Sequence, residues 1–335
     1  MRVVAESYIP YLRGRIEPFA DVDYRSPITA DDVRNADILL VRTRTRCDTA
    51  LLDGSRVRLI GTATIGTDHI DMDYCQRHGI DVVNAAGCNA PAVAQWVFAG
   101  IGRWMAAHSI TDTAALTVGV VGVGHVGSIV ARWAQELGFG VLLNDPPRAA
   151  REGEQGFVSL DQLAGQADII TFHTPLTLHG QWPTWHLCDE ALLAAATRCR
   201  LLMNASRGAV CDTHALLQWP GDLAIDCWEN EPHINLSLLQ RAFIATPHIA
   251  GYSLQGKQRG TAMLIDALNA RYGWHIDAVQ ADTPATGADH VTLESIVNSY
   301  DPLTDTDNLR AHHDQFDQLR NDYTLRSEVK TTPIG

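Results

Sequence analysis

Three side chains with complementary chemistry follow predicted buried strands in the second half of the chain. They are Arg207, Glu231 and His248. A histidine, whose pKa lies near neutrality, can accept the proton of a hydroxyl group, and an arginine fork can hold a carboxylate or a carbonyl oxygen. Glu231, if it accepts a hydrogen bond from His248, would favour the imidazolium. Taken singly, each residue is more often structural, but together they suit the oxidation of a hydroxy acid.

The elements that must position these residues are strands that alternate with helices. Apolar runs typical of buried strands cover residues 168–173, 200–204, 223–226 and 243–246, with helical stretches between them. Such alternation is typical of a doubly wound parallel sheet, in which ligands bind beyond the carboxyl ends of the strands. We therefore expect the three side chains to meet at one edge of the sheet.

A glycine-rich turn earlier in the chain is the expected cofactor element. The β-branched run 118–121 ends at Gly122, and Gly124 and Gly127 complete a Gly-x-Gly-x-x-Gly spacing before a predicted helix from residue 128. These glycines allow a tight turn, leave room for a pyrophosphate and let the helix pack closely on the strand, and the helix N-terminus favours phosphate. The order of strand, glycines and helix predicts a dinucleotide site.

Asp145 ends the next predicted strand, 141–144, and bears on which dinucleotide binds. An acid at this position accepts the hydroxyls of the adenosine ribose and repels a 2′-phosphate, which favours NAD over NADP. Arg148 keeps NADP open as an alternative, because a nearby arginine can accommodate a 2′-phosphate.

The remaining segments predict further domains around this sheet. Residues 1–90 alternate short strands with helices, and a helix over 253–273 is expected to return the chain to this first domain. We expect a substrate domain of residues 1–90 and 253–280, an NAD-binding domain of residues 91–252, and a C-terminal segment of residues 281–335. That segment is too short to bury a core alone, so we expect it to pack on a partner subunit.

Composition excludes several classes of partner. The 335 residues carry a net charge of −13, and 46% of them are hydrophobic. An acidic protein is not expected to bind nucleic acid or an anionic membrane. The N-terminus does not resemble a signal peptide, and no apolar run is long enough to span a membrane. The seven cysteines lack Cys-x-x-Cys spacing, so we expect reduced thiols in the cytoplasm and no metal site.

Four stretches together resemble the D-isomer-specific 2-hydroxyacid dehydrogenases. They are the glycine turn and residues 204–208, 226–232 and 247–251. The resemblance implies an NAD-dependent dehydrogenase with catalytic Arg207, Glu231 and His248, and a flavodoxin-like substrate domain. It also implies that Asp226 contacts the nicotinamide carboxamide. The cofactor contacts expected from the turn and the resemblance are Gly122, Gly124, His125, Val126, Gly127, Asp145, Thr174, Ser206, Arg207, Gly208, Asp226 and Gly251.

A narrower resemblance, over nearly the whole chain, is to the branch of this family that oxidises 4-phospho-D-erythronate. It is carried by residues 41–43, 61–69, 87–90, 145–149, 171–176, 248–252 and 316–323. It implies formation of (R)-3-hydroxy-2-oxo-4-phosphooxybutanoate in pyridoxal 5′-phosphate biosynthesis, and a homodimer built on the C-terminal segment. The substrate contacts it implies are Thr43, Thr64 and Tyr252. For the phosphate we consider Arg42, Arg44 and, from a partner subunit, Arg320.

Two other functions stay open. The first is another D-2-hydroxyacid dehydrogenase, such as one that acts on phosphoglycerate. The second is an NAD-sensing binding protein, because the family also includes corepressors that use the fold for recognition. The presence of all three catalytic residues favours an enzyme.

Overall fold

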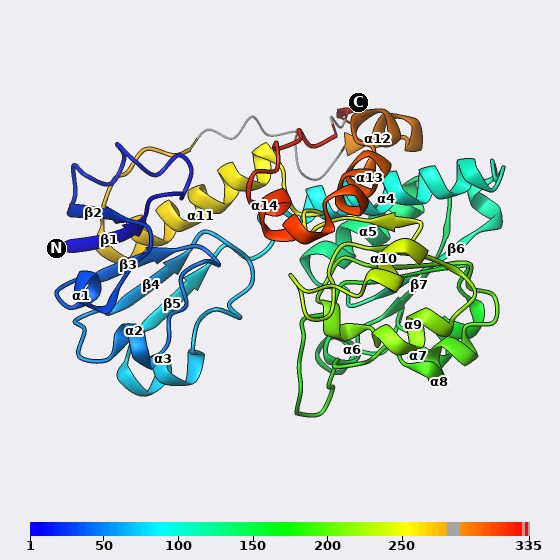
Figure 1. The fold of residues 1–335 in the computed structure, drawn as a ribbon, viewed down its shortest axis with the longest axis horizontal. Helices are drawn as coiled ribbons and strands as arrows, with labels where there is room; N and C mark the ends of the chain where they lie inside the picture. Colours follow the sequence, from blue (N-terminus) through cyan, green and yellow to red (C-terminus); the bar gives the residue numbers. More distant parts are fainter. Residues whose placement is uncertain (280–288, 330–331, 334–335) are drawn as a thin grey trace. The chain divides into compact units, whose positions relative to one another are not determined.

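The computed structural model describes residues 1–279, 289–329 and 332–333. The chain divides into two compact units (Figure 1). The first consists of Met1–Asn89 and Ser253–Thr283, and the second of Ala90–Tyr252 and Pro284–Gly335. Among the described residues, no helix is both long enough and apolar enough to cross a membrane.

The first unit is built on a parallel sheet with the strand order β2-β1-β3-β4-β5. Its strands are β1 (Arg2–Glu6), β2 (Asp21–Arg25), β3 (Ile38–Val41), β4 (Leu59–Thr62) and β5 (Asp81–Asn84). Its helices are α1 (Ala30–Val33), α2 (Thr49–Leu52), α3 (Met72–His78) and α11 (Leu254–Tyr272). The order 2-1-3-4-5 is that of flavodoxin-like folds, so the predicted fold class of this unit is confirmed.

Local sequence explains the ends of α11 and why the apolar pattern predicts every strand of the first unit except one. Ser253 caps α11 by accepting a hydrogen bond from the backbone N–H of Gly256, and Gly273 ends it in a left-handed conformation with φ 65°. The unpredicted strand is β2, whose sequence Asp-Val-Asp-Tyr-Arg is mostly polar. Because β2 lies at the edge of the sheet, no face of it is fully buried, and it carries no apolar run.

The second unit contains a six-stranded parallel sheet with the order β11-β10-β9-β8-β6-β7. Its strands are β6 (Thr117–Val121), β7 (Gly140–Asn144), β8 (Ile169–Phe172), β9 (Leu201–Asn204), β10 (Asp222–Ile225) and β11 (Ile244–Ala245). The chain runs from β6 to β7 on one side and then crosses to β8 on the other side. The carboxyl end of β6 is therefore the switch point at which such sheets bind ligands.

Helices cover both faces of this sheet, as a doubly wound fold requires. The helical segments before the C-terminal segment are α4 (Ala90–Ala107), η1 (Thr113–Ala115), α5 (His125–Glu136), α6 (Pro146–Glu152), α7 (Leu160–Gln166), α8 (Glu190–Ala195), η2 (Gly208–Val210), α9 (Thr213–Gln218) and α10 (Leu236–Arg241). Leu201 and Met203 of β9 face the core that includes α4 and α5, whereas Leu202 faces the core that includes α7 to α10. The sheet is thus buried on both sides.

The C-terminal segment packs on the second unit (Figure 1). It contains β12 (Asp289–His290), α12 (Leu293–Ser299), α13 (Pro302–Ala311), η3 (His313–Gln315), α14 (Phe316–Asn321) and β13 (Thr332–Pro333). Helix α12 packs against α4, and α13 packs against β11. The charged stretch 314–326 predicts a helix over its whole length, but α14 covers only Phe316–Asn321, and residues 323–325 are not helical. Whether the segment also forms a dimer interface stays a prediction.

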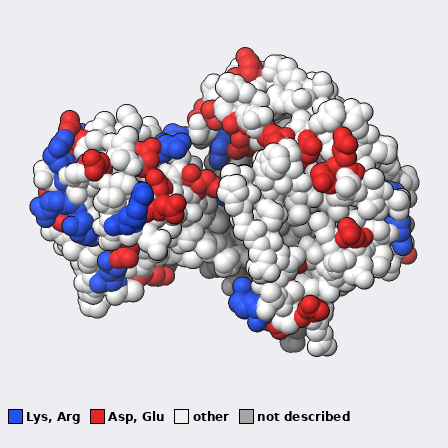
Figure 2. All heavy atoms as spheres, turned by 90° about the horizontal axis from the view of Figure 1, so that it is seen from below, with Lys and Arg blue, Asp and Glu red and all other residues white. Residues whose placement is uncertain are grey.

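Acidic and basic side chains occur together on the face of the molecule shown in Figure 2. On the face shown in Figure 2, lysine and arginine side chains are interspersed with acidic ones over the described residues, so this face carries no continuous basic surface. A long polyanion would have to approach acidic groups on this face together with basic ones.

Candidate active site

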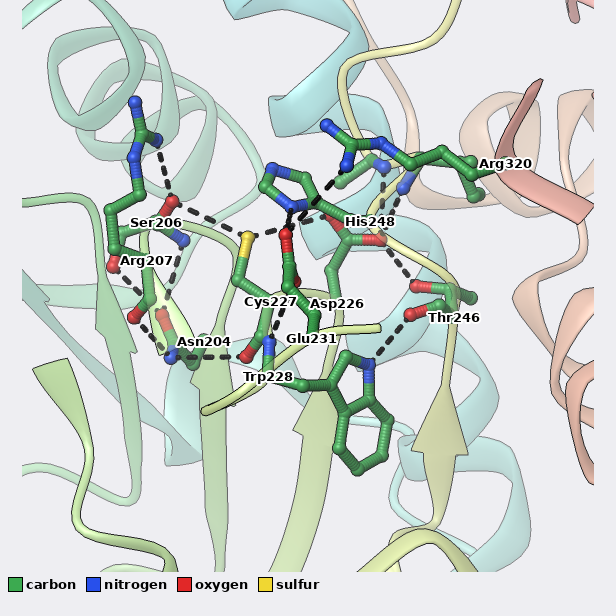
Figure 3. Close-up of polar contacts among 12 residues, drawn as sticks. Asn204, Ser206, Arg207, Asp226, Cys227, Trp228, Glu231, Thr246, His248 and Arg320 are labelled. Carbon is green, nitrogen blue, oxygen red and sulfur yellow. Dashed lines mark hydrogen bonds and ion pairs between the residues drawn. The ribbon is translucent and has the colours of Figure 1, made fainter. Parts of the chain in front are cut away.

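Arg207, Glu231 and His248 follow three adjacent strands of the second unit. Strand β10 pairs with both β9 and β11 in parallel, so the carboxyl ends of all three strands lie at one edge of the sheet (Figure 3). Each residue lies in the loop that leaves its strand. The sequence prediction that one edge receives all three side chains therefore agrees with the topology.

His248 and Glu231 are in direct contact. Nδ1 of His248 lies 2.5 Å from Oε1 of Glu231, and the other carboxylate oxygen accepts the backbone N–H of Trp228 at 3.2 Å. Burial favours the neutral form of Glu231, but the hydrogen bonds from His248 and Trp228 and the charge of Arg320 together lower its pKa. Glu231 is thus held as a carboxylate against the imidazole.

Asp226 shapes the loop that carries His248. Its Oδ1 accepts hydrogen bonds from the backbone N–H groups of Ile249 at 2.8 Å and Ala250 at 3.0 Å, and from the hydroxyl of Thr246 at 2.6 Å. The backbone N–H of His248 donates to the carbonyl of Asp226 at 2.9 Å. Burial raises the pKa of Asp226, although these hydrogen bonds and His248 act in the opposite direction. His248 has a φ of 55°, a strained conformation that these contacts maintain.

The loop after β9 is fixed by Asn204 and by a glycine. The side-chain carbonyl of Asn204 accepts hydrogen bonds from Ser206, and its amide donates to the backbone carbonyl of Arg207 at 2.9 Å. A Cβ at Gly208 would lie 2.0 Å from the backbone carbonyl of Trp228, so no larger residue fits there. These contacts place Arg207, whose Nη1 donates to the carbonyl of Ser206 at 2.8 Å.

The glycine turn leaves space at one of its three glycines. Gly122 has a φ of 85°, and a Cβ there would lie 2.9 Å from the backbone of Thr174. A Cβ at Gly127 would lie 2.0 Å from the carbonyl oxygen of Gly122, whereas a Cβ at Gly124 would have no neighbour within 4 Å. Helix α5 begins at His125, so its unpaired N–H groups adjoin this space. The turn fits a pyrophosphate at Gly124.

Two further features fit a dinucleotide. The hydroxyl of Thr174 is buried and has no hydrogen-bond partner among the described residues, so it can bond to a ligand. Asp145 accepts hydrogen bonds from the backbone N–H groups of Val123 at 2.8 Å and Arg148 at 2.9 Å, which hold its carboxylate beside the turn. The guanidinium of Arg148 is anchored by Glu152 at 2.7 Å and by the carbonyl of Val123 at 2.8 Å.

Most of the residues expected to bind substrate belong to the first unit. Thr43 is exposed, and the hydroxyl of Thr64 lies 2.7 Å from that of Thr62. The side chain of Arg42 donates to the carbonyl of Tyr8 at 3.2 Å. Of the substrate contacts that the resemblance implies, only Tyr252 shares the second unit with the catalytic residues.

The C-terminal segment places two arginines at this edge of the second unit. Nη1 of Arg320 lies 3.8 Å from Oε1 of Glu231 (Figure 3), and its side chain also bonds to Tyr252. Arg320 is a candidate phosphate ligand that we expected from a partner subunit, whereas here the Arg320 of the same chain lies beside Glu231. Arg326 bonds to the loop that follows His248, and the sequence analysis missed it. Neither residue stands in a strand-end pattern, so only a resemblance to proteins with this segment could have indicated them.

His186, Asp212 and Glu229 bring three potential metal ligands together, which the sequence did not predict. Nε2 of His186 lies 2.7 Å from Oε1 of Glu229, while Nδ1 faces Asp212 at 3.9 Å. Both carboxylates also accept backbone N–H groups at the start of α9. The arrangement is that of a histidine hydrogen-bonded to Glu229, with the carboxylate of Asp212 farther away on the other side of the ring.

Comparisons with known proteins agree with this geometry. The family model "D-isomer specific 2-hydroxyacid dehydrogenase, NAD binding domain" matches residues 82–250. The chain is similar to erythronate-4-phosphate dehydrogenase of Bacteroides thetaiotaomicron, at 41% identity over 100% of this chain and 99% of the relative. It is also similar to the enzyme of that name from Porphyromonas gingivalis, at 42% identity over 100% and 96%.

A solved structure extends the comparison to the fold. D-lactate dehydrogenase of Aquifex aeolicus, complexed with NAD and lactic acid, superposes with a TM-score of 0.67 at 25% identity. The match covers 81% of this chain and 96% of that enzyme. The chain thus shares its fold with an enzyme whose structure contains NAD.

Proposed function

The chain belongs to the D-isomer-specific 2-hydroxyacid dehydrogenase family, and we propose that it oxidises 4-phospho-D-erythronate to (R)-3-hydroxy-2-oxo-4-phosphooxybutanoate with NAD. The observation that carries the proposal is the 2.5 Å contact between His248 and Glu231 at the sheet edge that also receives Arg207. The substrate follows from the erythronate-4-phosphate dehydrogenases, which match this chain over its full length. By the same argument the reaction belongs to pyridoxal 5′-phosphate biosynthesis.

The contact assigns the two nitrogens of His248. Nδ1–H donates to Glu231, so Nε2 carries the lone pair and accepts the proton of the substrate hydroxyl. The imidazolium that results is stabilised by the carboxylate of Glu231. Arg207 holds the substrate carboxylate and the oxygen on the reacting carbon with its guanidinium fork. NAD, when bound, supplies the acceptor for the hydride that leaves this carbon.

The glycine turn and the neighbouring strand ends would hold NAD. The pyrophosphate would pass Gly124 and meet the N-terminus of α5 at His125 and Val126, and Asp145 would accept the ribose hydroxyls. Oδ1 of Asp226 already accepts three hydrogen bonds, so Oδ2 would receive the carboxamide. The remaining proposed contacts are Gly122, Gly127, Thr174, Ser206, Arg207, Gly208 and Gly251.

The substrate would be bound by Thr43, Thr64, Arg42 and Tyr252. An acidic protein with a net charge of −13 disfavours an anionic substrate, so arginines close to the site must hold the phosphate. Arg44 and Arg320 are the other candidates. We also propose that the protein acts in the cytoplasm as a homodimer formed through the C-terminal segment.

A substrate panel tests this function. Purified protein with NAD is given 4-phospho-D-erythronate, D-erythronate, D-3-phosphoglycerate and D-lactate, and NADH formation is followed by fluorescence. We expect kcat/KM for 4-phospho-D-erythronate to exceed that for D-erythronate by at least about 100-fold, because a charged hydrogen-bonded phosphate contributes about 3 kcal/mol. A preference for 3-phosphoglycerate would assign another dehydrogenase, and NADH binding without turnover of any acid would favour an NAD-sensing protein.

A further inference from the structure

Arg326, in the C-terminal segment, bonds to the loop that carries the catalytic base. We call residues 246–252 the His248 loop. Nη1 of Arg326 donates to the backbone carbonyls of Ile249 at 3.1 Å and Tyr252 at 3.0 Å, and Nη2 donates to the carbonyl of Ala250. One guanidinium therefore bonds to three carbonyls within four consecutive residues.

The same guanidinium also bonds to α4 and to its own segment. Nη2 donates to the carbonyl of Ala92 at 3.1 Å, and Nε donates to the side-chain carbonyl of Gln95 at 3.3 Å. The ring of Tyr300 lies beneath it, 4.2 Å from its central carbon to the ring centroid. Gln95 is fully buried and donates in turn to Ser299 at 2.9 Å and to the carbonyl of Ser327 at 3.1 Å. The guanidinium thus joins the His248 loop to a rigid helix.

The His248 loop is held from two sides by opposite charges. Asp226 accepts the N–H groups of Ile249 and Ala250, and Arg326 donates to the carbonyls of the same two residues. The carboxylate of Asp226 thus bonds to N–H groups of the loop, and the guanidinium of Arg326 bonds to its carbonyl groups. Because His248 has a φ of 55°, the loop needs contacts that fix this conformation.

Only a guanidinium can make this set of contacts. Its planar fork presents five N–H donors in fixed directions, whereas a lysine ammonium is a point charge with three. The hydrogen bonds that the Arg326 guanidinium donates all go to neutral acceptors, since the side-chain carbonyl of Gln95 rather than an acid faces Nε. The arrangement is therefore a set of directed hydrogen bonds rather than an ion pair.

We propose that Arg326 is a positioning residue, which holds the backbone of residues 249–252 against α4 and so fixes His248 and Tyr252 for the reaction. The inference rests on the proposed function, because it assigns the effect to turnover at His248. A displacement of about 1 Å in a reacting group can reduce the rate by about 100-fold. The C-terminal segment would then contribute to catalysis through the backbone of the His248 loop.

The test compares three variants of the full-length protein. Arg326→Ala removes all the contacts, and Arg326→Lys keeps the charge without the fork. Arg310→Ala is the matched control, because Arg310 lies in the same segment and its Nη2 donates to the carbonyl of Ala242 at 2.5 Å, outside the His248 loop. For each variant we would measure kcat, KM, NADH affinity, the thermal unfolding midpoint and hydrogen exchange of peptides that cover residues 246–252.

For Arg326→Ala we expect kcat to fall by about 10- to 100-fold, faster exchange in residues 249–252, and NADH affinity within about threefold of wild type. Arg326→Lys should recover part of kcat. Arg310→Ala should keep kcat within about twofold of wild type, even if its unfolding midpoint falls as far as that of Arg326→Ala. Unchanged exchange in Arg326→Ala, or equal loss of kcat in Arg310→Ala, would overturn the proposal. If wild type oxidises no tested acid, the proposed function fails, while the exchange measurement still decides whether Arg326 holds the loop.

Discussion

Replacing Gly124 or Gly127 by alanine should separate cofactor binding from folding, although both belong to one motif. A Cβ at Gly127 would lie 2.0 Å from the carbonyl oxygen of Gly122, so α5 must retreat by about 1.4 Å to reach an ordinary contact of 3.4 Å. Such overpacking against backbone costs about 3 kcal/mol, and the higher helix propensity of alanine returns about 1 kcal/mol. We expect Gly127→Ala to lose about 2 kcal/mol of unfolding free energy.

Gly124→Ala should behave in the opposite way. A Cβ there meets no atom within 4 Å, so the loss is limited to replacing an N-cap glycine by alanine, and we expect the unfolding free energy to fall by no more than about 1 kcal/mol. The same methyl group would occupy the space expected for the pyrophosphate. NADH affinity should therefore fall at least about tenfold, which is about 1.4 kcal/mol.

Urea unfolding without cofactor and NADH titration by fluorescence measure the two effects independently. If Gly124→Ala binds NADH as tightly as wild type, the pyrophosphate does not pass Gly124 and the proposed cofactor position is wrong. If Gly127→Ala is as stable as wild type, the close contact between Gly127 and the carbonyl of Gly122 does not constrain the packing of α5.

Three further substitutions test polar groups of the second unit that are buried or half-buried. Glu231→Gln should reduce kcat by about 100-fold, because an amide can donate to Nδ1 of His248 and favour the wrong tautomer; near-native NADH formation would contradict this. Burial lowers the pKa of His173 from 6.5 to about 3, so below pH 6.5 the unfolded chain binds a proton that the folded protein does not. The unfolding free energy should then decrease by about 2 kcal/mol between pH 7 and pH 5 because of His173. His173→Asn should remove this pH dependence, measured by urea unfolding at each pH. Thr246→Val should lose about 2 kcal/mol, since Asp226 and the Trp96 indole N–H both lose a partner; an unchanged urea midpoint would refute it.

The sequence predicts the sheet of the second unit well, because each of its buried strands is an apolar run next to a turn. The positions of Arg207, Glu231 and His248 then follow from parallel pairing alone. The contact between His248 and Glu231 could be proposed from the sequence, but its length depends on Asp226 and Trp228, which hold the two loops. Such distances arise only once the chain is packed.

Two features have no local signal in the sequence, for physical reasons. Strand β2 is a polar edge strand, so the apolar pattern that marks the other strands is absent. Arg320 lies within the short helix α14 and Arg326 follows it, and neither belongs to a local motif, so their roles depend on where α14 packs. The resemblance over residues 316–323 indicated Arg320, whereas nothing in the sequence indicated Arg326. An arginine in a charged helical segment is usually solvated, so nothing local distinguishes these two from Arg310.

The most direct test of the account is the reaction of His248→Asn with 4-phospho-D-erythronate and NAD. Asparagine cannot accept the hydroxyl proton as an imidazole does, so kcat should fall by at least about 100-fold across the pH range. NADH should still bind with nearly wild-type affinity, because the glycine turn and Asp145 are unchanged. Turnover within a few-fold of wild type by a variant that binds NADH normally would contradict the assignment of His248 as the base.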